Sequence, residues 1–157
     1  MLMDGLKAVP FKTKGNGNVL RAYWSEQAMR ADPVTEREVL ALLDRYGEAL
    51  RNNDPEALIG IFTGDEDTML IGAISGEFAV GAEAVAALFR RVFAEPQHMR
   101  MAWDRVEVFC SGEVAWFAAD GAIVAWDTRI PYRLTGVLER RDGQWRFAQF
   151  HSSCPPQ

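Results

Sequence analysis

The residue best suited to acid–base chemistry is His151, close to the end of the chain. An imidazole titrates near neutral pH, so it can accept and return a proton during a reaction. Side chains alternate over residues 145–153, and strict alternation places Trp145, Gln149 and His151 on one face of a strand. We therefore predict His151 as a catalytic acid or base and Gln149 as a ligand-binding neighbour. Since no carboxylate is identified beside it, a locally hydrogen-bonded structural histidine is the alternative.

Three more side chains have the chemistry of a ligand site. Arg133 stands near the start of a predicted strand, where its guanidinium could hold a carboxylate through two hydrogen bonds. Trp116 and Trp126 belong to the preceding strand, and aromatic walls suit a flat apolar ligand. We predict that these three residues bind the ligand. The alternative is that they lie at a rim, in the core or in a subunit interface.

The sequence predicts no metal site and no cofactor. Asp65, Glu66 and Asp67 are adjacent, and they lack the alternating spacing and closing glutamate of a calcium loop. The chain has 2 cysteines and 2 histidines, so a tetrahedral zinc site would need all of them. Glycine-rich phosphate loops, nucleophile elbows and HExxH sequences do not occur in it.

Length and composition indicate one globular domain. The chain has 157 residues, of which 48% are hydrophobic and 25% charged. A net charge of -5 argues against nucleic-acid binding. No apolar run is long enough to span a membrane, and the first residues lack a signal-peptide pattern. We therefore predict a cytoplasmic protein with free thiols and no membrane partner.

The first half of the chain is predicted to supply the helices that pack around the candidate site residues. Residues 35–50 place apolar side chains at helical spacing, behind a capping-box sequence at Thr35–Glu38. Asp54 and Pro55 have the types expected at the start of a second helix. Residues 82–93 predict a third helix, which follows Gly81.

From His98 onward the apolar period changes to two, which is typical of strands. We predict four long strands and two short ones, over residues 98–109, 113–126, 130–141, 145–153, 68–71 and 77–80. Short turns join the long strands, and this indicates antiparallel pairing. The order of elements predicts an α+β fold with three helices packed on one side of a curved antiparallel sheet.

Residues 1–34 are predicted to be an extension of the domain formed by residues 35–157. Residues 12–18 are polar and rich in glycine and asparagine, which predicts loop or disorder. Residues 19–30 could form a short helix that docks, through Trp24, on the domain or on a partner chain.

Four features together resemble the NTF2-like superfamily and, within it, the SnoaL-like proteins. They are the helix pair in DRYGEALRNNDPEALIGIF, the glycine-led helix in FAVGAEAVAALFRRVF, the four-strand meander and the closing strand WRFAQFHSSCP. The resemblance covers about residues 35–155. It implies a cone in which the helices close over the concave face of the sheet and leave a pocket open at one end.

The resemblance also implies a homodimer, since members commonly pair through the outer face of the sheet. The predicted strand 113–126 fits this expectation because both of its faces are apolar. One face carries Trp116 and Val124, and the other carries Phe117 and Ile123. A strand of this kind is buried on both faces.

Tyr46 lies where the ketosteroid isomerases, which the first helix resembles, place the tyrosine of the oxyanion hole. The resemblance implies that its phenol donates a hydrogen bond to a developing enolate. The isomerases also use a carboxylate base on the first strand, here Met69–Gly72, and an aspartic acid near Thr135. Both acids are missing, which argues against isomerase chemistry. We predict a catalytic or ligand-orienting Tyr46, with a core tyrosine as the alternative.

Two functions remain open at this stage. The first is a pocket for a small apolar or partly anionic molecule, with the option of cofactor-independent acid–base chemistry. The second is a non-catalytic dimeric interaction module whose pocket is filled by its own side chains. The superfamily contains enzymes, binders and docking modules, so the fold does not choose between them. We favour the small-molecule pocket, and whether the protein is an enzyme stays open.

Overall fold

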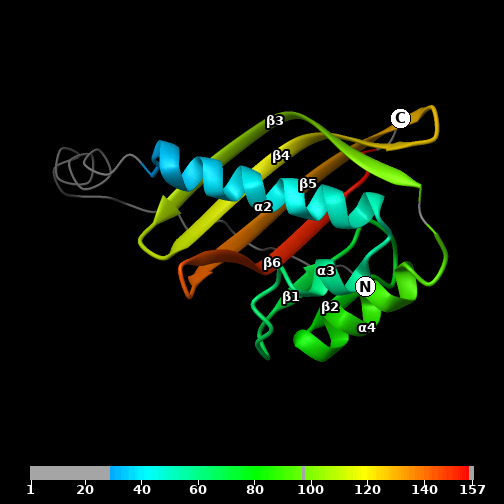
Figure 1. The fold of residues 1–157 in the computed structure, drawn as a ribbon, viewed down its shortest axis with the longest axis horizontal. Helices are drawn as coiled ribbons and strands as arrows, with labels where there is room; N and C mark the ends of the chain where they lie inside the picture. Colours follow the sequence, from blue (N-terminus) through cyan, green and yellow to red (C-terminus); the bar gives the residue numbers. More distant parts are fainter. Residues whose placement is uncertain (1–28, 97, 156–157) are drawn as a thin grey trace, which may run out of the picture.

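The computed structural model describes residues 29–96 and 98–155. Within these residues the chain has an α+β fold with three helices and six strands, as predicted (Figure 1). In chain order the elements are α2 (Pro33–Arg51), α3 (Pro55–Ile59), β1 (Met69–Ile71), β2 (Phe78–Val80), α4 (Ala82–Val92), β3 (Met99–Ser111), β4 (Val114–Ala125), β5 (Thr128–Arg141) and β6 (Gln144–Ser153).

The six strands form one sheet in the order β2-β1-β6-β5-β4-β3. The four long strands are an antiparallel meander, whereas β1 pairs with β6 in parallel. The predicted all-antiparallel sheet is therefore wrong at this one pairing. The meander brings β6 back beside β1 with the same chain direction. Figure 1 shows α2 lying across one face of the long strands, with α3 and α4 gathered beside β1 and β2.

Helix α2 begins two residues before the predicted capping box. Asp32 caps it, because its Oδ1 accepts the amides of Val34 at 2.8 Å and Thr35 at 3.2 Å. Pro33 occupies the first helical position, where a missing N–H costs nothing. The hydroxyl of Thr35 donates to the other carboxylate oxygen of Asp32 at 2.7 Å. The predicted capping box at Thr35 is thus wrong.

The core lies between α2 and the concave face of the sheet. The predicted apolar stripe of α2 is buried, and Val39 and Leu42 have no exposed surface. Phe147 of β6 packs opposite them and is also fully buried. Burying a side chain of this size contributes about 1.5–3 kcal/mol, so the stripe anchors α2 on the sheet.

A β-bulge in β6 decides which side chains face the core. Val137 of β5 lies opposite Gln149, but the next residue, Leu138, lies opposite Phe147. Ala148 is therefore the extra residue of the bulge, and side chains beyond it change faces. Phe150 is buried, whereas His151 is exposed. The prediction that Trp145 shares one strand face with Gln149 and His151 is wrong for this reason.

Residues 29–31 pair with the edge of the sheet at β3. The amide of Ala31 donates to the Val108 carbonyl at 3.1 Å, and the amide of Cys110 donates to the Met29 carbonyl at 2.8 Å. The predicted loop at 12–18, nearly all of the predicted helix at 19–30, and Trp24 lie outside the described residues. No described helix is long and apolar enough to cross a membrane.

Candidate functional site

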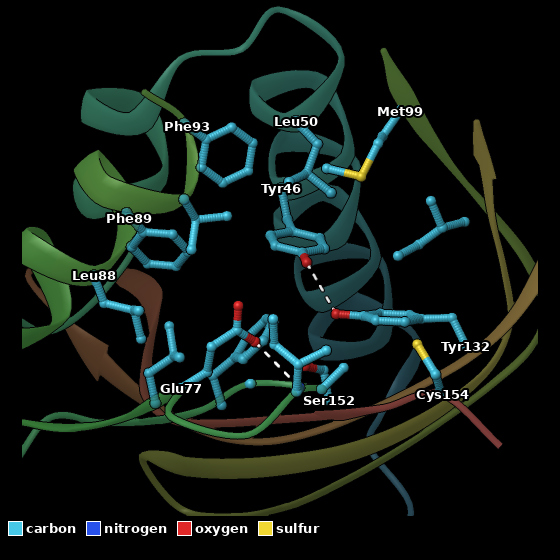
Figure 2. A pocket seen from close by; sticks show the side chains of 17 residues that line it. Tyr46, Leu50, Glu77, Leu88, Phe89, Phe93, Met99, Tyr132, Ser152 and Cys154 are labelled. Carbon is cyan, nitrogen blue, oxygen red and sulfur yellow. Dashed lines mark hydrogen bonds between the residues drawn. The ribbon is translucent and has the colours of Figure 1, made fainter. Parts of the chain in front are cut away.

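A cavity of about 270 Å³ lies between the helices and the concave face of the sheet. Its walls come from α2, α4, the hairpin between β1 and β2, and the inner faces of the long strands (Figure 2). Most lining side chains are apolar, among them Leu50, Leu88, Phe89, Phe93 and Phe150. The structure therefore contains a chamber of the kind that takes a small apolar molecule.

Three hydroxyls form the polar corner of the cavity. The hydroxyl oxygens of Tyr46 and Tyr132 are 3.3 Å apart, and either can donate to the other. Ser152 lines the same cavity, and its side chain lowers the pKa of Tyr132. All three residues are buried, with 4–5% of their surface exposed. In such a place, hydroxyls are expected to be hydrogen-bonded to each other or to a ligand.

Each hydroxyl is positioned by its own element. Tyr46 lies on the buried stripe of α2, one turn after Leu42 and one turn before Leu50. Tyr132 lies on the inner face of β5, two residues before the fully buried Leu134. Ser152 reaches the cavity because the bulge in β6 turns its side chain inward.

Burial sets the protonation state of the two tyrosines. It raises the pKa of Tyr46 well above the usual phenol value, and Tyr132 and Glu77 nearby raise it further. Burial also raises the pKa of Tyr132, and the side chains of Ser152 and Tyr46 oppose this shift. Both phenols are therefore neutral at physiological pH. They can donate hydrogen bonds to a ligand oxygen, but they are not bases.

Glu77 is the one residue that lines the cavity, among those described, with a charged side chain. Figure 2 shows its carboxylate reaching into the cavity from the β1–β2 hairpin, across from the two tyrosine hydroxyls. The carboxylate accepts the amide of Ile74 at 3.3 Å. A Cβ at Gly72 would come within 2.0 Å of a carboxylate oxygen, so glycine there lets Glu77 fold over the hairpin.

These groups define what the cavity can do chemically. The phenols can stabilise a carbonyl oxygen or a developing oxyanion. The carboxylate of Glu77 can accept a proton or a hydrogen bond, or hold a positive charge. The described part of the chain contains no cluster of three or more His, Cys, Asp or Glu that could hold a metal ion.

Of the six site residues predicted from the sequence, Tyr46 lines the cavity and the other five do not. His151 and Gln149 are on the outer face of the sheet, beyond or within the bulge. Gln149 lines a shallow outer groove together with Trp116. Arg133 also points outward, and its Nε is 3.1 Å from a carboxylate oxygen of Asp120. None of these four side chains lines the cavity, so the structure does not bring them together with Tyr46.

Trp126 occupies the turn between β4 and β5. It has a positive φ of 55° and 78% of its surface is exposed. Its ring lies 4.9 Å from the ring of His98. Trp126 does not line the cavity. A ligand contact by Trp126 stays a prediction, and it would have to occur outside the cavity.

Three functional candidates were missing from the sequence analysis, namely Glu77, Tyr132 and Ser152. The alternation of β5 contained a signal for Tyr132, because it shares a register with Leu134 and Leu138. Glu77 directly precedes β2, which pairs with β1, and the search for a carboxylate was limited to the first strand itself. No pattern in the sequence predicts the bulge, so the position of Ser152 in the cavity could not have been predicted.

Residues 39–157 match the model of the SnoaL-like domain family. The chain belongs to the SnoaL-like domain family. The match spans more than half of the chain and confirms the resemblance seen in the sequence. No curated protein matches this SnoaL-like chain in sequence.

Solved structures share the fold of this SnoaL-like domain. An NTF2-like protein of unknown function from Pseudomonas putida has a TM-score of 0.70 and 22% identity, over 80% of this chain and 90% of its own. A suggested dehydratase of the NTF2-like family from Streptomyces avermitilis has a TM-score of 0.70 and 16% identity, over 80% and 100%. A protein of unknown function with a cystatin-like fold, from Nostoc punctiforme, has a TM-score of 0.69 and 16% identity, over 82% of this chain and 97% of its own. At these identities the similarity shows the fold alone.

Proposed function

We propose that this SnoaL-like domain binds a small, largely apolar molecule in its cone cavity and hydrogen-bonds one ligand oxygen through Tyr46 and Tyr132. The observation that carries the proposal is the group of buried hydroxyls in an otherwise apolar chamber. A chamber of about 270 Å³ also argues against the interaction-module alternative, which needs a pocket filled by its own side chains.

The ligand is proposed to carry no negative charge. A partly anionic ligand was expected because an Arg133 side chain that pointed into the cone could anchor a carboxylate, but Arg133 lies on the outer face. The described residues that line the cavity include no lysine or arginine, and they include the carboxylate of Glu77. An anion in this chamber would lose its hydration and meet a like charge, so it would be excluded.

A homodimer through the outer face remains part of the proposal. On that face Phe109 and Trp116 stack with ring centroids 6.0 Å apart, and Val114 and Ala118 beside them are exposed. Exposed apolar surface of this kind favours association. The cytoplasmic location stays a prediction as well, made from composition.

The proposal is tested by thermal shift with neutral apolar ketones and alcohols, such as acetophenone and cyclohexanol, and with the carboxylates benzoate and cyclohexanecarboxylate. A neutral ligand at about 100 times its Kd should raise the Tm by roughly 5–10 °C. Tyr46→Phe should weaken that ligand about fivefold by removing one hydrogen bond. His151→Ala, on the outer face, should leave the affinity unchanged.

Two results would overturn the proposal. One is the absence of stabilisation by every compound, whatever its charge. The other is an equal loss of affinity in Tyr46→Phe and His151→Ala, because the outer-face residue is the matched control.

A further inference from the structure

We propose that the preferred ligand is a small substituted ammonium ion, seated between the Glu77 carboxylate and the aromatic walls of the cavity. This inference rests on the proposed function, since it names the charge class of the molecule that the same cavity takes. Three features of the described residues support it, and each concerns a different group of atoms.

The first feature is a carboxylate that has no cationic partner within residues 29–96 and 98–155. Among the described residues, no basic side chain forms an ion pair with Glu77. Arg91 is close to the same hairpin, but its guanidinium donates to the Gly76 carbonyl at 3.4 Å. A carboxylate has about four acceptor positions, and the amide of Ile74 uses one. A cation in the cavity would therefore meet an uncompensated charge with room to accept hydrogen bonds.

The second feature is the number of aromatic rings that line the same cavity. Five lining residues are aromatic, namely Tyr46, Phe89, Phe93, Tyr132 and Phe150. Ring centroids are 5.3 Å apart for Tyr46 and Phe150, and 6.4 Å apart for Phe89 and Phe93. The face of each ring carries negative electrostatic potential, which attracts a cation at close range. Aromatic walls combined with an anionic group are typical of sites that recognise substituted ammonium ions.

The third feature is the polarity of the hydroxyl corner. A neutral hydroxyl is an acceptor as well as a donor, so the oxygens of Tyr46, Tyr132 and Ser152 can accept N–H groups. Every polar side-chain group identified around the cavity can thus stabilise a positive charge. A ligand oxygen bonded to the tyrosines is compatible with an ammonium group at Glu77, since Figure 2 shows the two on opposing sides.

The test compares three compounds that share one heavy-atom skeleton and differ in charge. Benzyldimethylammonium is the cation and carries one N–H donor, isobutylbenzene replaces its nitrogen with carbon, and phenylacetate is the anion. Isothermal titration with the full chain should give at least about tenfold tighter binding of the cation than of the neutral compound, and the weakest binding for the anion. Glu77→Gln keeps an acceptor for the Ile74 amide and should reduce the preference for the cation to less than about threefold.

Two further variants make the test specific. Glu83→Gln removes the same charge from an exposed position on α4 and should preserve the preference for the cation. Phe93→Leu removes one aromatic wall and should weaken the cation more than the neutral compound, even if Glu77→Gln fails to fold.

The possible failures are distinguishable. Equal affinities for the cation and its neutral counterpart, or an unchanged preference in Glu77→Gln, would overturn the ammonium inference while the binding cavity stands. No measurable binding of any of the three compounds would count against the proposed function itself and against the inference with it.

Discussion

The hydroxyl pair of Tyr46 and Tyr132 links stability to pH. In the unfolded chain both phenols ionise near pH 10, whereas burial raises the pKa of both in the folded protein. The stability that the two neutral phenols contribute to the folded protein is therefore fully present below about pH 10. It is lost as the pH rises through the folded-state pKa values. The free energy of unfolding should fall above pH 10 by about 1.4 kcal/mol per pH unit for each tyrosine.

Urea unfolding between pH 8 and pH 11 measures this slope. Tyr46→Phe should remove one tyrosine's share of it, and Tyr46→Phe combined with Tyr132→Phe should remove both shares. A slope in the double variant equal to that of the wild type would show that other groups cause it.

Gly136 tests the packing of the inner face of β5. A Cβ there would come within 2.6 Å of the Phe117 ring and 2.9 Å of the Gln149 carbonyl oxygen. Since the carbonyl belongs to the paired strand, it cannot move away easily. Gly136→Ala should lower the free energy of unfolding by about 1–3 kcal/mol in urea titrations.

Gly47 on α2 supplies the opposite control. A Cβ at Gly47 would meet Met101 at 3.6 Å, which is an ordinary contact. Gly47→Ala should therefore stabilise the protein by up to about 1 kcal/mol, because alanine favours the helix. If both variants change the free energy of unfolding in the same direction, the proposed clash of a Cβ at Gly136 is contradicted.

At the scale of elements, helices and strands follow from the period of the apolar residues. The stripe that ends at Leu50, the Asp54 and Pro55 start of α3, and the four long strands were all predictable. The inward position of Tyr46 was predictable for the same reason, since helical periodicity carries it. The faces of β6 beyond the bulge were not predictable, because the insertion of the single residue Ala148 exchanges them.

A pair of neighbouring substitutions tests the bulge. Phe150→Ala should lower the free energy of unfolding by about 3–5 kcal/mol, because a buried ring is removed from the core. His151→Ala should change it by less than about 0.5 kcal/mol, because the side chain is exposed. Chemical denaturation of both variants measures these losses. If β6 followed strict alternation, His151→Ala would destabilise the protein more than Phe150→Ala.

At the scale of the whole molecule, the described helices cover one face of the sheet, and no described element covers the other. The helices cover the concave side, while the outer side presents Trp116 and Phe109 in a shallow groove. The sequence signalled this through the apolar character of both faces of β4, but a single chain cannot show what covers the second face. Dimerisation is the explanation that we propose.

The dimer prediction is tested with two tryptophan substitutions. Trp116→Arg places a charge in the outer groove and should convert a dimer into a monomer in light scattering at micromolar concentration. Trp126→Arg changes an exposed tryptophan in a turn and should leave the mass unchanged. A wild-type protein that is monomeric under these conditions would contradict the prediction.

The central claim is that the ligand binds inside the cone and not on the outer face. An amide ¹H–¹⁵N NMR titration of the full chain, with whichever compound gives the largest thermal shift, tests it most directly. The account predicts shifts concentrated around Tyr46, Glu77, Phe89 and Phe150. Shifts concentrated around Trp116, Val137 and Gln149 of the outer groove would contradict it.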